Sequence, residues 1–250
     1  MRLLISVKSA AEASAALAGG ADVIDAKDPV AGALGAVSLE VLLRIHAASE
    51  GRRPVTAALG DAADEAAIES AARVFAAAGA AFVKVGFAGI TNISHVLALT
   101  AATVRGAKAG SNARSGGVAV AYADADRAAT LAPSTVVTVA ARAGAEGVLL
   151  DTADKSGPGL RELLAPTALA TWVADVHAAG LFAAVAGKLT AEDLPFARDA
   201  GADIAGIRGA ACDGGRAGRV TADRVRLLRA LCGPPTNRAA ERSEPAVRTL

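Results

Sequence analysis

The stretch Ala18-Gly19-Gly20-Ala21-Asp22-Val23-Ile24-Asp25-Ala26-Lys27 joins an alanine-rich segment to a short run that suits a β-strand. Alanine favours helix, glycine is typical just past a helix C-terminus, and Val23–Lys27 fits a buried strand. The same helix-end phrase returns at Ala78-Gly79-Ala80-Ala81, Ala143-Gly144-Ala145-Glu146 and Ala200-Gly201-Ala202-Asp203. This repetition predicts one kind of helix-to-strand connection along the whole chain.

Eight strands follow from the same pattern, separated by alanine-rich segments as in βαβ units. We predict them at Leu3–Val7, Val23–Lys27, Val55–Leu59, Phe82–Gly86, Val118–Tyr122, Val148–Thr152, Phe182–Ala186 and Ile204–Arg208. A chain of 250 residues without a breaker-rich linker fits one large α/β domain. We therefore expect a single (β/α)8 TIM barrel over residues 1–232, with a doubly wound sheet as the alternative.

The last part of the chain changes character. Gly233-Pro234-Pro235 breaks the final helix, and no sustained apolar face follows it. We expect residues 233–250 to form a C-terminal tail that is mobile or packs loosely, although a short helix is compatible with its alanine and arginine content.

Composition excludes several classes of protein. A net charge of +1 favours neither nucleic acid nor an anionic membrane as a partner. The longest charge-free apolar run, Val85–Val104, is interrupted by polar residues, and the N-terminal apolar run ends at Lys8, too early for a signal peptide. Cys212 and Cys232 lack metal-ligand spacing. We expect a cytoplasmic protein with reduced thiols and no metal, and the sequence leaves a homo-oligomer open.

Charged residues stand where the barrel would place its active site. Catalytic groups collect at the C-terminal ends of barrel strands, where alternate residues point inward. Asp25 and Lys27 share one side of the second strand, Lys84 lies between valines in the fourth, and Asp151 with Lys155 ends the sixth. A buried unpaired charge costs several kcal/mol, so these residues need compensation or a function. A structural ion-pair network is the alternative interpretation.

The choice of lysine over arginine favours function. The chain has 20 arginines and six lysines, and five of the lysines lie at or just past a predicted strand end. Arginine stays protonated, whereas a deprotonated lysine amine attacks a carbonyl and forms an imine. At an ordinary pKa only about one lysine in a thousand is neutral at pH 7, but burial and neighbouring ammonium groups increase that fraction. Clustered lysines with aspartates therefore indicate a Schiff-base site.

A phosphate site is predicted after the last two strands. Gly187 and Lys188 follow the seventh strand, and Arg208 and Gly209 end the eighth. Small residues with free backbone N–H groups at this place bind phosphate in many barrels, whereas simple tight turns are the alternative. Asp124 and Asp126, after the fifth strand, fit either a proton-transfer role or solvated loop carboxylates equally well.

The sequence resembles the (5-formylfuran-3-yl)methyl phosphate synthases from about Arg2 to Cys232. The matching segments are Gly20-Ala21-Asp22-Val23-Ile24-Asp25-Ala26-Lys27-Asp28-Pro29, Gly32-Ala33-Leu34-Gly35-Ala36, Val83-Lys84-Val85-Gly86, Tyr122-Ala123-Asp124-Ala125, Leu150-Asp151-Thr152-Ala153 and Gly206-Ile207-Arg208-Gly209-Ala210-Ala211-Cys212. The tail after Gly233 and the loop at residues 154–159 match less well.

The resemblance implies a lyase that condenses two glyceraldehyde 3-phosphate molecules, with loss of phosphate and water, in methanofuran biosynthesis. It makes Lys27 the imine-forming nucleophile, Lys84 the proton-transfer residue, and Asp25, Asp151 and Lys155 supporting groups, with no cofactor. Two rivals remain: another Schiff-base aldolase acting on a sugar phosphate, and a non-catalytic barrel that binds a phosphate ligand.

Overall fold

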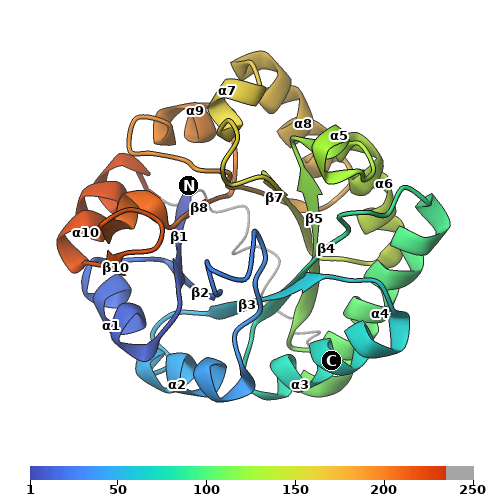
Figure 1. Cartoon of the computed structure of the whole chain (residues 1–250), viewed down its shortest axis with the longest axis horizontal. Helices are drawn as coiled ribbons and strands as arrows, with labels where there is room; N and C mark the ends of the chain where they lie inside the picture. Colours follow the sequence, from blue (N-terminus) through green and yellow to red (C-terminus); the bar gives the residue numbers. More distant parts are fainter. Residues whose placement is uncertain (235–250) are drawn as a thin grey trace, which may run out of the picture.

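The computed structural model describes residues 1–234, which form a closed barrel of eight parallel strands in sequence order (Figure 1). The strands are β1 Arg2–Val7, β2 Val23–Ala26, β3 Val55–Asp61, β4 Phe82–Gly86, β5 Gly116–Tyr122, β6 Gly147–Asp151, β7 Phe182–Val185 and β8 Ile204–Ile207. The predicted TIM barrel is confirmed, and the doubly wound alternative is wrong because β1 pairs with β8 and closes the sheet. All eight predicted strands are present, with ends that differ by at most two residues.

Helices surround the barrel and join consecutive strands (Figure 1). They are α1 Ala10–Ala18, α2 Leu39–Ser49, α3 Glu65–Ala77, α4 Ile93–Ser111, α5 Ala125–Ala128, α6 Pro133–Ala143, α7 Leu160–Leu163, α8 Pro166–Ala178, α9 Leu194–Asp199 and α10 Ala222–Leu231. The predicted helix-end glycines lie where these helices turn into strands. Gly144, for example, ends α6 with a φ of 73°, a left-handed conformation that costs glycine little.

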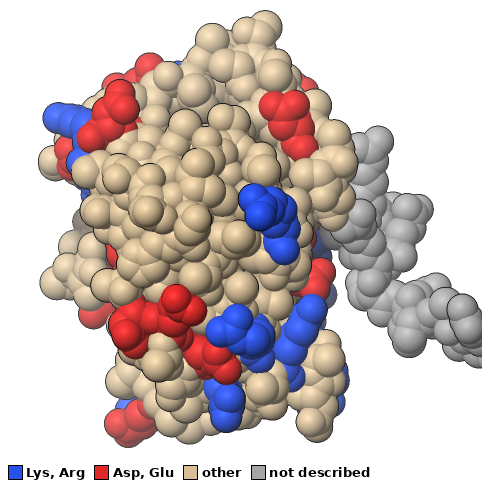
Figure 2. All heavy atoms as spheres, turned by 90° about the vertical axis from the view of Figure 1, so that its right-hand side faces the viewer, with Lys and Arg blue, Asp and Glu red and all other residues tan. Residues whose placement is uncertain are grey.

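Helices α3 and α4 pack unusually closely, which the two glycines of α4 make possible. A Cβ at Gly106 would lie 2.2 Å from the Glu69 carbonyl oxygen, and one at Gly110 would lie 2.1 Å from that of Arg73. Arg105 donates to the Glu69 carboxylate across the same contact, at 2.8 Å. The adjoining surface carries large areas without Lys, Arg, Asp or Glu (Figure 2), as expected of alanine-rich helices.

The barrel has two layers of core. Leucine, isoleucine and valine side chains fill the space between strands and helices. The lumen holds a second cluster that includes small residues, among them Ala58, Ala184 and Ala186. Gly206 also faces the lumen. A Cβ at this position would meet only ordinary contacts, the nearest at 3.4 Å. These small side chains leave room inside the barrel for a ligand.

After β8 the chain adds a feature that the sequence pattern did not predict. A short 3-10 helix, η1 Gly209–Ala211, leads into a small antiparallel hairpin of β9 Cys212–Asp213 and β10 Arg219–Val220. The hairpin brings the turn at residues 214–218 to the mouth of the barrel, where Arg216 donates to the Gly32 carbonyl at 3.0 Å.

The described part of the chain ends at Pro234, whose carbonyl accepts from the Met1 amino group at 3.0 Å. Residues 235–250, most of the predicted tail, lie outside the described residues, so the expectation of a loosely packed tail remains a prediction. Among residues 1–234, no helix has the length and apolar character to cross a membrane.

Candidate active site

One cavity of about 330 Å³ runs along the barrel lumen to the C-terminal ends of the strands. All nine residues predicted from the sequence line it. They are Asp25, Lys27, Lys84, Asp151, Lys155, Gly187, Lys188, Arg208 and Gly209. These residues lie on or just after five of the eight strands, and closure of the barrel brings together positions up to 184 residues apart in the sequence, from Asp25 to Gly209.

Asp25 is the centre of a fully buried polar cluster. Its Oδ1 accepts from Thr56 Oγ1 at 2.7 Å and from Lys84 Nζ, and its Oδ2 accepts from Ser6 Oγ at 3.0 Å. Strand register explains this arrangement, because Ser6 and Thr56 are the direct partners of Asp25 in β1 and β3. Although burial alone raises it, the pKa of Asp25 is lowered overall because the Lys84 and Lys27 ammonium groups favour the carboxylate.

Lys27 differs from the other lysines of the site. Its residue is only 6% exposed, and among residues 1–234 its amine forms neither an ion pair nor a hydrogen bond. The pKa of Lys27 is lowered to about 8, mainly by burial; Asp151 and Asp25 oppose this shift, and Lys84 and Lys155 add to it. At that pKa roughly one amine in ten is neutral at pH 7, a hundredfold more than for an ordinary lysine.

Lys84, in contrast, is held by Asp25 in a buried ion pair. Asp25 lies two residues before Lys27 on the same side of the chain, so about 6.6 Å of strand separates their Cα atoms. The ion pair therefore keeps the Lys84 ammonium deeper in the lumen than Lys27, further from the C-terminal ends of the strands.

A second pair of charges lies across the lumen at the end of β6. Lys155 donates to Asp151 Oδ1 at 2.6 Å, and the Thr152 backbone N–H donates to the same oxygen at 2.8 Å. The second carboxylate oxygen of Asp151 is buried and has no hydrogen-bond partner among the described residues. The pKa of Asp151 is nevertheless lowered because Lys155 and Lys27 outweigh the effect of burial. The second oxygen therefore keeps its capacity to accept a hydrogen bond.

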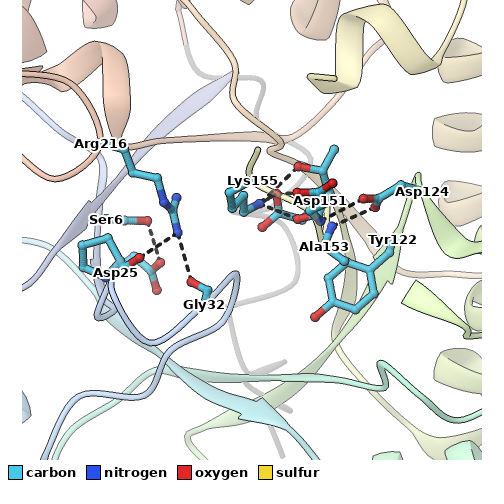
Figure 3. Close-up of polar contacts among 12 residues, drawn as sticks. Ser6, Asp25, Gly32, Tyr122, Asp124, Asp151, Ala153, Lys155 and Arg216 are labelled. Atoms are coloured by element: carbon cyan, nitrogen blue, oxygen red, sulfur yellow. Dashed lines mark hydrogen bonds and ion pairs between the residues drawn. The ribbon is translucent and has the colours of Figure 1, made fainter. Parts of the chain in front are cut away.

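Asp124 fixes the loop that carries this pair (Figure 3). Its two carboxylate oxygens accept from the backbone N–H groups of Ala153 and Asp154, at 2.7 and 2.9 Å. The sequence allowed two interpretations of Asp124, a proton-transfer group or a solvated loop carboxylate. In the structure the carboxylate is buried and positions the β6 loop, a contact that neither interpretation describes. Asp126 does not share in the contact, because it lies in the first turn of α5.

The predicted phosphate residues lie at the ends of β7 and β8. Gly187 has a φ of 101° and Lys188 a φ of 58°, so the turn after β7 is left-handed. Lys188 Nζ donates to the Gly157 carbonyl, which ties this turn to the β6 loop. Gly209 begins η1, where the first N–H groups of a helical turn have no intrahelical acceptor.

Arg208 is placed at the cavity but is fully engaged by the protein. It pairs with Glu12 at 2.8 Å in a buried ion pair. Its remaining donors reach three backbone carbonyls, those of Ser6, Arg216 and Gly218. No guanidinium N–H is left for a ligand, so Arg208 holds the β8 loop in place and reaches a phosphate only by giving up one of these bonds.

Three residues of the site were not predicted from the sequence. Ser6 and Thr56 fix Asp25, and their signal was available as polar residues within otherwise apolar strands. Arg216 lines the cavity from the β9–β10 turn. Nothing in the glycine-rich segment around it indicated that this turn folds back over the barrel mouth.

Comparison with known proteins agrees with the geometry. Residues 3–229 match the 4-HFC-P synthase family. The chain is 37% identical to "(5-formylfuran-3-yl)methyl phosphate synthase" of Methanocaldococcus jannaschii over 93% of its length and 100% of that protein. It is 38% identical to the protein of the same name from Methanothermobacter thermautotrophicus, covering 92% and 98% of the two chains. A "Putative (5-formylfuran-3-yl)methyl phosphate synthase" of Kitasatospora aureofaciens is also 38% identical, covering 92% and 93%.

Solved structures share the fold. A 3-hexulose-6-phosphate synthase superposes with a TM-score of 0.60 at 23% identity, covering 92% of this chain and 99% of the other. KGPDC of Streptococcus mutans gives a TM-score of 0.66 at 15% identity, covering 92% and 96%. At these identities the likeness extends to the barrel alone. The family match and the relatives over nearly the whole chain are decisive: this chain belongs to the (5-formylfuran-3-yl)methyl phosphate synthase family.

Proposed function

We propose that this chain condenses two molecules of glyceraldehyde 3-phosphate into (5-formylfuran-3-yl)methyl phosphate, as a Schiff-base lyase in methanofuran biosynthesis. Two triose phosphates contain the atoms of one product molecule, one phosphate and two waters, so neither an oxidant nor a reductant is needed. The observation that carries the proposal is the buried, unpaired amine of Lys27 between two carboxylate–lysine pairs.

The proposed chemistry begins at Lys27. Its neutral amine adds to a triose carbonyl, and loss of water gives an imine that withdraws electrons from the neighbouring carbon. Loss of a proton from that carbon expels the phosphate of the adjacent carbon and leaves an enol. The terminal carbon of this enol then attacks the carbonyl of the second triose, once that triose has isomerised to its ketone form. Ring closure through a hydroxyl of the second triose, with a net loss of two waters, gives the furan, and hydrolysis of the imine frees Lys27.

Each such step requires a proton to be moved, and the two ion pairs supply the groups. Lys84 is the proposed proton carrier on the β4 side, where its ion pair with Asp25 orients it. Asp151 presents its unpartnered oxygen from the β6 side and is the proposed acceptor for a substrate proton or hydroxyl. Lys155 donates a hydrogen bond to the other oxygen of Asp151 and neutralises the charge of this carboxylate.

The phosphate of the imine-forming triose is proposed to lie at the ends of β7 and β8. Gly187, Lys188 and Gly209 line the cavity there, and the flexible ammonium of Lys188 is able to move from a carbonyl to a phosphate. Arg208 supports this site by holding the loop, as its contacts with Glu12 and three carbonyls favour.

The pH dependence of the reaction tests the state of Lys27. Since the neutral amine reacts and the pKa is about 8, kcat/KM should rise about tenfold per pH unit from pH 6.5 to 7.5 and level off above pH 8. The range starts at pH 6.5 because substrate phosphate, with a second pKa near 6, is then mostly the dianion. A profile that stays flat across this range, with unchanged circular dichroism, would contradict the proposed nucleophile.

Gly209→Val tests the phosphate site. A Cβ at this position meets only the Arg216 backbone, at 3.8 Å, so valine should not disturb the fold. Its branched side chain would occupy the phosphate position, and we expect KM for glyceraldehyde 3-phosphate to rise at least about tenfold, the effect of losing one charge-assisted hydrogen bond. Gly215→Val, on the open side of the neighbouring turn, is the control for crowding of the loop, although its φ of 70° adds strain. An unchanged KM in a folded Gly209→Val protein argues against this site.

The reaction itself is tested by incubating the pure protein with glyceraldehyde 3-phosphate and recording its ultraviolet absorbance. An aromatic aldehyde absorbs strongly, whereas an aldolase on another sugar phosphate makes no furan. A binding protein without activity leaves the substrate unchanged. Appearance of the furan with one equivalent of inorganic phosphate is the expected result.

A further inference from the structure

Arg216 is a cation of the cavity that the proposed chemistry has not used. It lies on the turn between β9 and β10, lines the cavity, and is half-buried. Its Nη2 donates to the Gly32 carbonyl at 3.0 Å and to that of Pro29 at 3.5 Å. Its Nε and Nη1 have no acceptor among residues 1–234. A half-buried guanidinium with free donors that face a cavity is suited to bind an anion.

Three cations that line the cavity have a carboxylate partner, whereas Arg216 has none among residues 1–234. Lys84 is paired with Asp25, Lys155 with Asp151, and Arg208 with Glu12. Within the described part of the chain, Arg216 forms no ion pair, and burial lowers its pKa. The charge that it offers is therefore uncompensated, as in sites that bind an anionic ligand.

The position of Arg216 separates it from the phosphate site proposed above. Its guanidinium contacts the loop that follows β2, whereas Gly187 and Lys188 follow β7, and β8 and β1 lie between these strands. Figure 3 shows Arg216 reaching towards Gly32, across the opening from Asp151 and Lys155. Arg216 thus lies over the loop that follows Lys27, and Lys188 lies three strands away in the barrel order.

We propose that Arg216 binds the phosphate of the second triose, so that the site holds two phosphate groups, one at the loop after β2 and one at the ends of β7 and β8. This inference rests on the proposed function, because a condensation of two phosphorylated molecules needs two such subsites. Each phosphate carries about −1.5 to −2 charges at pH 7, and one subsite cannot neutralise both. Phosphate at Arg216 also satisfies the donors that the protein leaves free.

The first experiment separates the two substrate molecules. Borohydride trapping of the imine requires only the first triose, whereas furan formation requires both. In Arg216→Met we expect furan formation to fall about fiftyfold, as the loss of a charge-assisted contact predicts, and trapping at Lys27 to stay within about threefold of wild type. Arg216→Lys should recover part of the loss. Arg219→Met is the control, since Arg219 is exposed on the same hairpin and does not line the cavity.

Two results would overturn the assignment: furan formation unchanged in Arg216→Met, or trapping reduced as much as furan formation. Arg216→Gln removes the charge but keeps a donor for the Gly32 carbonyl, so it should behave like Arg216→Met if charge matters and like wild type if Arg216 only holds the loop. Melting temperatures check that each variant is folded.

A binding measurement makes the test independent of the reaction. Titration with inorganic phosphate in a calorimeter should give two sites per wild-type chain and one in Arg216→Met. One site in the wild type, or two in the variant, contradicts the proposal for Arg216 even if furan is made. Two sites in the wild type with no furan and no trapped imine would instead reject the proposed function and leave the Arg216 subsite in place.

Discussion

Lys27→Arg is expected to abolish both turnover and imine trapping, while the folded protein remains. Guanidinium keeps the positive charge but cannot add to a carbonyl, because it stays protonated at any working pH. In wild type, borohydride with glyceraldehyde 3-phosphate should fix mass on Lys27 alone, found by peptide mapping. The assignment rests on the buried amine without an ion pair and on its pKa of about 8.

Lys84→Arg is the matched variant, because it changes the same residue type in the same lumen. Arginine preserves the ion pair with Asp25 but is a poor proton carrier, so turnover should also be lost. Slow trapping at Lys27 should persist, since imine formation does not require Lys84 as nucleophile. Mass on Lys84 instead of Lys27 would reverse the two roles. An active enzyme that is never labelled would exclude the Schiff base altogether.

Asp25→Asn should cost about 3–5 kcal/mol of the free energy of unfolding, the largest stability effect that we expect in the lumen. The substitution removes the counter-ion of Lys84, whose side chain is 6% exposed beside a carboxylate that is 1% exposed. It also disturbs the hydrogen bonds that Ser6 and Thr56 donate to Asp25. Urea unfolding, followed by circular dichroism, measures the change.

The double variant Asp25→Asn with Lys84→Met shows whether the cost comes from the unpaired ammonium. Removal of that charge should restore at least about half of the lost stability, since the coupling of a buried pair is of this size. Glu40→Gln, which breaks an exposed pair with Arg44, should change stability by less than about 1 kcal/mol. A cost for Asp25→Asn as small as that of Glu40→Gln would mean that the lumen is more hydrated than its burial indicates.

The sequence predicted the barrel well because its signals are local. Helix-end glycines such as Gly79 and Gly144, followed by short apolar runs, mark each change from helix to strand. The same logic placed Asp25, Lys27 and Asp151 at strand ends facing one lumen. Their meeting follows from closure of the sheet, which any parallel eight-stranded barrel imposes.

What the sequence could not predict depends on contacts made at long range. The ion pair of Arg208 with Glu12 joins residues 196 positions apart, and no local pattern indicates it. Glu12 and three backbone carbonyls accept all the hydrogen bonds that Arg208 can donate. We therefore propose that Arg208 supports the loop, whereas the sequence predicted a phosphate ligand. Arg216 was missed for a similar reason, because its turn reaches the β2 loop only through the hairpin after β8.

The two carboxylate–lysine pairs also bear on how the barrel lumen balances its charges. Asp25 is neutralised by Lys84 and Asp151 by Lys155, so these four charges cancel. The Lys27 amine has no counter-ion of its own in this cluster, although its charge favours both carboxylates. Because its reduced basicity comes mainly from burial, the closed barrel itself provides the condition for a neutral amine at this position.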